Sequence, residues 1–183
     1  MSDFPFSIPT TQPTSQPSFN HIQTSVNGGV YIYSVPGYNG SNEVKLTPLS
    51  GLTITPNSSS QNVVIHMSVY GEWQTNPHAA AISLKRVVGG VETWLDGRPS
   101  SSDGFFHVNA QFSITHLSSS SPAPETLSYT FVDTPNTNSE ITYDVYLKNS
   151  SSSQTFSLNR TTSTGSGFNY ERGISTFTAE CKG

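Results

Sequence analysis

The feature that most constrains the fold is a period-two alternation of apolar and polar residues, which recurs along the chain from residue 21 onward. In residues 63 to 70 the odd positions through 69 are Val, Ile, Met and Val, while the even positions are Val, His, Ser and Tyr. Because successive side chains of a strand point to opposite faces, this pattern predicts a strand with one buried face. No helical period of any length is present, so we expect an all-β fold.

Further strands are separated by turn residues. Gly89-Gly90 lies between two alternating segments, residues 82 to 88 and 91 to 95, as is typical of a two-residue hairpin. Eight to ten strands at this spacing, without helices to make parallel crossovers, predict an antiparallel sandwich or jelly roll. The other expected strands are residues 30 to 33, 52 to 55, 106 to 115, 127 to 131, 141 to 147, 156 to 158 and 170 to 183.

The last of these strands runs to the final residue. Ser175, Phe177, Ala179 and Cys181 fall on one side of it, and the intervening residues fall on the other. We therefore expect the strand to lie within a sheet and close the jelly roll. Cys181 is the only cysteine, so the chain has no internal disulfide and its stability depends on packing and assembly.

Residues 1 to 20 differ from the rest of the chain. Prolines recur every four residues from position 5 to position 17, which forbids a helix and favours extended, polyproline-like backbone. Two interpretations remain open: a disordered linker, and an anchoring arm that docks on a neighbouring subunit. We divide the chain into this Pro-rich arm, residues 1 to 20, and a β domain, residues 21 to 183. The residues expected to anchor the arm are Phe4, Phe6, Ile8 and Phe19.

The predicted surface is polar but nearly uncharged. Charged residues make up 11% of the chain, against about 25% in an average soluble domain. Such a surface suits a protein covered by copies of itself or by a larger assembly, and a Ser/Thr-rich secreted β domain is the alternative. The net charge of −4 argues against nucleic-acid binding. No apolar run is long enough to cross a bilayer and the first residues do not resemble a secretion signal, so we expect synthesis in a cytoplasm.

We expect no enzymatic activity, cofactor or metal. The chain has no Gly-x-Ser-x-Gly motif, and its histidines never occur at metal-ligand spacings. A sugar-cleaving enzyme stays as an alternative, since paired carboxylates meet in space rather than in sequence. Trp73 and Trp94 could form a sugar-stacking platform, although a tryptophan in a β domain also fits a core or an interface. The ligand-loop candidates, in residues 71 to 78 and 97 to 104, are Trp73, His78 and Asp103.

Several segments together resemble a known family. Residues 129 to 137, Tyr-Thr-Phe-Val-Asp-Thr-Pro-Asn-Thr, and residues 172 to 178, Arg-Gly-Ile-Ser-Thr-Phe-Thr, resemble the C-terminal β domains of virion structural proteins from bacteriophages and large algal viruses. Residues 49 to 56 are similar to the segment that opens those domains, and the likeness covers roughly residues 46 to 183. The resemblance implies a jelly roll of the C1q and tumour-necrosis-factor (TNF) type that assembles as a homotrimer.

The resemblance further implies a viral structural protein at the virion surface. A short arm in place of a long stalk favours capsid decoration or a short spike over a long fibre, with a capsid or tail protein of the same virion as partner. The alternative is a host receptor- or glycan-binding module of a phage tail or head fibre. Ordinary cross-strand packing is the competing explanation for outward tyrosines. The candidates for the trimer interface are Tyr129, Tyr146, Tyr170 and Phe177.

Overall fold

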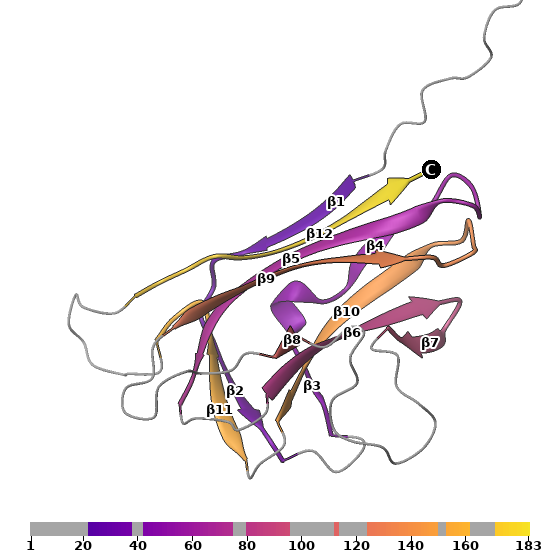
Figure 1. The fold of residues 1–183 in the computed structure, drawn as a ribbon. Helices are drawn as coiled ribbons and strands as arrows, with labels where there is room; N and C mark the ends of the chain where they lie inside the picture. The colour runs from indigo at the N-terminus through magenta and orange to yellow at the C-terminus, as the bar shows by residue number, and fades with distance from the viewer. Residues whose placement is uncertain are drawn as a thin grey trace, which may run out of the picture.

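The computed structural model describes residues 22 to 37, 42 to 74, 80 to 95, 112 to 113, 124 to 149, 153 to 161 and 171 to 183. These residues form two antiparallel sheets that stack face to face, with one 3-10 turn at Thr47–Leu49 (Figure 1). The predicted all-β, antiparallel jelly-roll sandwich is confirmed. The Pro-rich arm lies outside the described residues, so its boundary with the β domain stays a prediction.

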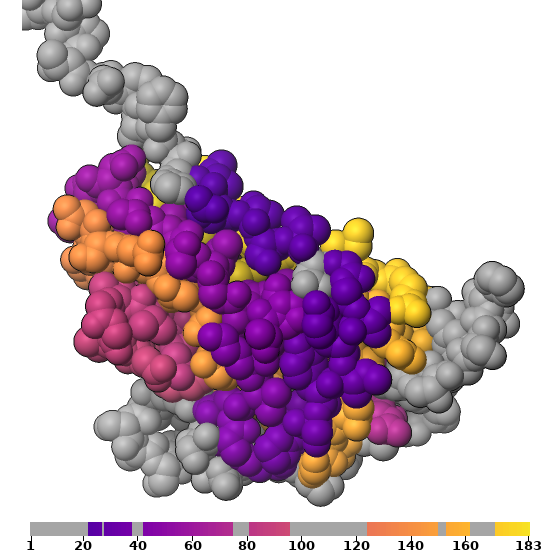
Figure 2. Space-filling view, turned by 180° about the vertical axis from the view of Figure 1, so that it is seen from behind, coloured from indigo at the N-terminus to yellow at the C-terminus, as the bar shows by residue number. Residues whose placement is uncertain are grey.

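The first sheet contains both the first and the last strand of the described chain. Its order is β1-β12-β5-β11-β2, and β9 pairs with β5. The space-filling view shows the indigo atoms of the first strands at the surface next to yellow atoms of the C-terminal segment (Figure 2). The strands are β1 (Ile22–Asn27), β2 (Tyr31–Val35), β5 (Asn62–Trp73), β9 (Glu125–Asp133), β11 (Gln154–Leu158) and β12 (Ser175–Lys182).

The second sheet has the order β3-β10-β6-β7, with β4 paired to β10 and β8 paired to β6. The chain crosses between the sheets repeatedly, from β5 to β6, from β7 by way of β8 to β9, and from β9 to β10. Such crossings between two antiparallel sheets define a jelly roll. The strands are β3 (Val44–Lys45), β4 (Leu52–Ile54), β6 (Ala80–Val88), β7 (Val91–Trp94), β8 (Phe112–Ser113) and β10 (Ile141–Asn149).

One hydrophobic core fills the space between the sheets. Ser175, Phe177, Ala179 and Cys181 of β12 are fully buried there, as the alternation predicted. Burial raises the pKa of the Cys181 thiol, so this cysteine is poorly reactive as well as inaccessible. The largest fully buried side chains are those of Tyr143, Phe156, Phe177, Leu46, Leu49, Ile54, Ile65, Ile82, Leu84, Ile141, Leu147 and Leu158.

The hairpin predicted at Gly89-Gly90 is confirmed. It joins β6 to β7, and both glycines have positive φ, +56° and +81°, which suits the twist of the flanking strands. Of the strand predicted over residues 106 to 115, only β8 lies within the described residues. The final strand begins at Ser175, whereas Arg172 makes a single bridge with Arg160.

β5 changes its neighbour partway along its length. Residues 62 to 68 pair with β12, and residues 71 to 73 pair with β11. At the changeover Ser175 Oγ accepts a hydrogen bond from the Tyr70 N–H at 2.9 Å and donates to Asn159 Oδ1 at 2.6 Å. Asn159 has a positive φ of 61° and donates its Nδ2–H to the Gly29 carbonyl at 2.8 Å. These polar contacts close the gap between β12 and β11.

Candidate functional site

The outward side of the first sheet carries four of the seven large apolar side chains that are exposed among the described residues. We call the outward residues of β1, β12, β5 and β9, together with Ile174, the outer β1–β9 face. Four exposed aliphatic residues lie on it: Ile22 at 55%, Val26 at 63%, Val132 at 54% and Ile174 at 61% exposure. Between them stand Thr24, Thr126, Thr130, Thr176, Thr178, Ser68, Ser128, Val64, His66 and Tyr70.

This face carries almost no charge, and its polar groups bond to one another. Glu180 at one end is paired with Lys182, with 3.1 Å between Oε2 and Nζ. Elsewhere on the face, His66 Nδ1 lies 3.0 Å from Thr130 Oγ1, and the hydroxyl oxygens of Thr24 and Thr178 lie 3.2 Å apart. The face can therefore pack against another neutral surface without burying an unpaired charge.

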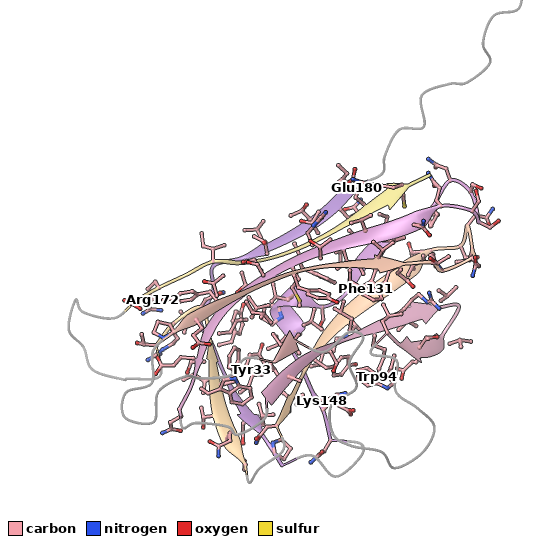
Figure 3. The ribbon with its side chains drawn as sticks, in the orientation of Figure 1. Tyr33, Trp94, Phe131, Lys148, Arg172 and Glu180 are labelled. Atoms are coloured by element: carbon pink, nitrogen blue, oxygen red, sulfur yellow. The ribbon has the colours of Figure 1, made fainter. Side chains whose placement is uncertain are left out.

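The opposite side of the molecule carries a different cluster. We call Lys45, Lys85, Trp94, Tyr146 and Lys148, on the outward side of the second sheet, the lysine–aromatic face. The ring centroids of Trp94 and Tyr146 are 5.0 Å apart at an interplanar angle of 66°. Figure 3 shows Trp94 and Lys148 on the side of the sandwich away from Glu180.

Each lysine of the lysine–aromatic face is fixed by neighbouring groups. Lys85 Nζ lies 4.5 Å from the Trp94 ring centroid, 4.8 Å from that of Tyr146, and 2.8 Å from Glu92 Oε2. Burial alone would lower the pKa of Lys85, but the hydrogen bond and charge of Glu92, together with Tyr146, outweigh it and raise the pKa. Lys148 Nζ lies 5.2 Å from the Trp94 ring, and Lys45 Nζ lies 2.8 Å from Asp144 Oδ2.

A third polar group lies between the sheets and is structural. Asp133 of β9 accepts hydrogen bonds from Arg86 Nη1 at Oδ1 and from the Tyr143 hydroxyl at Oδ2, both at 2.7 Å. Burial, then the charge and hydrogen bond of Asp133, raise the pKa of Tyr143 far above its usual value. The phenol therefore stays protonated and donates to the carboxylate, which joins β9 to the facing β6 and β10.

Two candidate site residues were wrong. Phe177, predicted at the trimer interface, is fully buried because the odd residues of β12 face the second sheet. Trp73, predicted as a ligand contact, is 4% exposed and packs on Phe156 with ring centroids 5.0 Å apart. It therefore forms no platform with Trp94, which lies outside the other sheet.

The remaining candidates are only partly placed. Tyr129 is half-buried on β9 and packs against the core, while Tyr146 packs on Trp94 across the second sheet. The two tyrosines thus do not share a surface, and their role in a trimer stays a prediction. Outside the described residues lie the arm residues Phe4, Phe6, Ile8 and Phe19, the ligand-loop candidates His78 and Asp103, and Tyr170.

Sequence reasoning missed the outer β1–β9 face. β1 was not predicted as a strand because Gln23, Thr24 and Ser25 interrupt its apolar residues, and its aliphatic side chains point to solvent. A signal was nevertheless present: Ile22, Thr24 and Val26 are all β-branched residues at period two.

Neither a metal site nor a membrane-spanning helix is found among the described residues. No three His, Cys, Asp or Glu side chains there are placed to share a metal ion. No helix in the same part of the chain has the length and hydrophobicity that a membrane span requires.

Comparisons with known proteins give likeness in structure only. No protein-family model matches the chain, and no curated protein matches its sequence. Among solved structures, a chain of the infectious bursal disease virus particle is similar with a TM-score of 0.42 at 10% identity. That match covers 96% of this chain and 39% of the viral chain.

Two further solved structures are similar at the same level. A chain of the infectious bursal disease virus Gx strain has a TM-score of 0.41 at 12% identity, covering 99% of this chain and 44% of its own length. Eiger TNF from S. frugiperda has a TM-score of 0.43 at 8% identity, covering 90% of this chain and 93% of its own. This chain therefore spans less than half of the two viral chains, and nearly all of the TNF chain.

Proposed function

We propose that this chain is a structural component of a virion surface, a capsid decoration or short spike, which assembles as a homotrimer and is anchored by residues 1 to 20. The observation that carries the proposal is the outer β1–β9 face. Four of its aliphatic residues are each more than half exposed, and the ion pair of Glu180 with Lys182 stands at one end. In a monomer these apolar side chains stay in contact with water, whereas association of copies through this face removes their apolar surface from water and stabilises the assembly. The low overall charge and the sequence resemblance support the same role.

The distribution of apolar residues favours a ring over a face-to-face dimer. Ile22 and Val26 lie on β1, and Val132 lies on β9 at the other border. The central strands β12 and β5 carry fewer exposed aliphatic side chains: their outward residues are Thr176, Thr178, Glu180, Lys182, Val64, His66, Ser68 and Tyr70. A two-fold contact across the centre would bury the polar rows, whereas a cyclic trimer joins one border to the opposite border of the next copy.

The area of the face points the same way. Four strands spaced about 4.8 Å apart, with about six residues at roughly 3.4 Å each, give a patch of roughly 400 Å². A stable interface buries about 800 Å² per partner. The face alone is therefore too small, and the edges of β1 and β9 beside it must contribute, as they do when subunits meet border to border.

Light scattering on the purified chain tests the trimer. We expect a mass of three times the 19.8 kDa monomer. Val26→Asp or Ile174→Asp places a charge in the interface and should give a monomer of unchanged fold. Val91→Asp is the matched control, because Val91 is 69% exposed on β7 of the other sheet, and it should remain trimeric. A monodisperse wild-type monomer would refute the trimer.

The virion role is tested separately on particles. Antibody labelling of intact virions, imaged by electron microscopy, should place the chain on the surface. Removal of residues 1 to 20 should leave a folded trimer in solution but prevent incorporation into particles. Normal incorporation of the shortened chain would count against the anchoring arm, and absence of label from the virion would count against the location.

A further inference from the structure

His66 is a titratable side chain within the neutral rows of the outer β1–β9 face. It is exposed on β5 and lies opposite Thr178 of β12 and Thr130 of β9. Histidine is the residue whose charge ordinarily changes between about pH 5 and pH 8. We propose that protonation of His66 makes assembly through this face pH-sensitive, so that copies associate at neutral pH and separate in weak acid. This inference rests on the proposed trimer.

The position of His66 places it beneath any copy that covers the β9 border of the face. Val132, which is 54% exposed, faces Val64 across the β5–β9 pair. His66 faces Thr130, two residues further along both strands. His66 and Val132 are therefore diagonal neighbours, with side chains roughly 7–8 Å apart. A neighbouring copy that removes Val132 from water therefore lies over the imidazole as well.

The neutral form of the imidazole suits a covered position. Its Nδ1 lies 3.0 Å from Thr130 Oγ1, and a hydroxyl can donate to this nitrogen or accept from it, so either tautomer is satisfied. Protonation turns both ring nitrogens into donors and adds a charge. Water solvates that charge in a separated copy, whereas a covering copy removes the water. Acid therefore favours the separated copies.

The charged groups around His66 offer an imidazolium no counter-ion. On β12, Glu180 is its diagonal neighbour and pairs with Lys182, so the two together are neutral. Asp133, at the end of β9, is buried on the inward side and pairs with Arg86. A covered imidazolium therefore meets no net negative charge from the described strands around it, and burying such an unpaired charge is costly. The other outward neighbours on β5, β12, β9 and β1 are uncharged: Val64, Ser68, Thr176, Thr178, Ser128, Thr130, Val132 and Thr24.

Light scattering of the full-length chain over a dilution series, at about pH 8 and at about pH 5, tests the inference. We expect trimers at the higher pH and association at least about tenfold weaker at the lower pH, because separation takes up protons. His66→Gln can still bond to Thr130 but takes up no proton, so its association should be the same at both pH values. His66→Lys is charged at both and should associate weakly at both.

His116→Gln is the matched control, because it removes an imidazole that is not among the residues of this face. It should lose association in acid as the wild type does. A wild-type monomer at the higher pH would refute the proposed trimer, and the inference with it. A trimer equally stable at both pH values, or a His66→Gln variant that still separates in acid, would refute the inference alone. Separated copies must keep the native circular dichroism spectrum, and loss of that spectrum at the lower pH would likewise overturn the inference.

Discussion

Asp133 joins the two sheets through two buried donors. The Arg86 guanidinium and the Tyr143 hydroxyl each hold one of its carboxylate oxygens at 2.7 Å. Both donors lie on other strands than Asp133: Arg86 is 47 residues away in the sequence and Tyr143 is 10 residues away. The alternation of β6 and β10 predicted that Arg86 and Tyr143 face inward, but not that a single carboxylate would satisfy both.

Replacing Tyr143 with Phe should destabilise the fold by about 1–3 kcal/mol, because the buried Asp133 carboxylate loses one of its two donors. Urea unfolding monitored by circular dichroism measures the loss. Tyr31→Phe is the control: Tyr31 is 38% exposed, and its change should stay within about 0.5 kcal/mol. A Tyr143→Phe variant as stable as the wild type would show that the hydroxyl contributes nothing.

Tyr33 predicts a pH dependence on the alkaline side. Burial, then the negative charge of Tyr31, raise its pKa from 10.0 to about 12. The folded state therefore holds this proton more tightly than the unfolded state, so stability is complete below about pH 10 and falls as the pH rises toward 12. Urea unfolding at pH 9, 10 and 11 measures the decline. Tyr33→Phe should make it shallower, with the other groups of raised pKa, among them Tyr143, Tyr70 and Cys181, supplying the remainder; an unchanged slope would contradict the assignment.

At the scale of elements, β5 is paired with β12 up to Ser68 and with β11 from Gly71. Between these two positions, the backbone at Gly173 closely approaches the ring of Tyr70. The Tyr70 ring lies against Gly173, where a Cβ would overlap the ring near its attachment. Rotation of the outer ring atoms cannot relieve that overlap. The glycine is therefore required by the ring above it rather than by its own backbone angles.

Gly173→Ala should cost about 1–3 kcal/mol, the range for overpacking a filled site. In a Tyr70→Ala background the same substitution should cost much less, so a double-mutant cycle followed by thermal unfolding should show coupling. Gly28→Ala is the control, because a Cβ there meets only Ile174, at 3.9 Å. Equal costs of Gly173→Ala with and without the Tyr70 ring would argue against the contact.

The sequence predicted those elements whose inward face is apolar. β5, β9 and β12 follow the alternation closely, since each has the core on one side, whereas outward residues of β10 such as Asp144 and Lys148 are buried as well. β1 escaped prediction because its aliphatic side chains point outward. Two site predictions were wrong for a related reason. Alternation places Phe177 and Trp73 on the same face as other apolar residues, but it does not show that the second sheet covers that face.

At the scale of the whole molecule, self-association predicts a stability that depends on protein concentration. A trimer is stabilised by mass action, so hundredfold dilution should lower the wild-type Tm by several degrees. Val26→Asp should have a lower Tm that does not change on dilution. Differential scanning fluorimetry over this concentration range measures both. A wild-type Tm independent of concentration would argue against an assembly held by the outer β1–β9 face.

The position of β12 also sets the order in which the molecule can be made. β12 lies between β1 and β5, two strands that are synthesised more than a hundred residues earlier. Until the ribosome has released residues 175 to 182, both strands keep an unpaired edge and the core lacks Phe177. Contacts of such long sequence separation form slowly. While residues 74 to 174 are being synthesised, the nascent chain therefore exposes unpaired strand edges, at which partly folded chains aggregate.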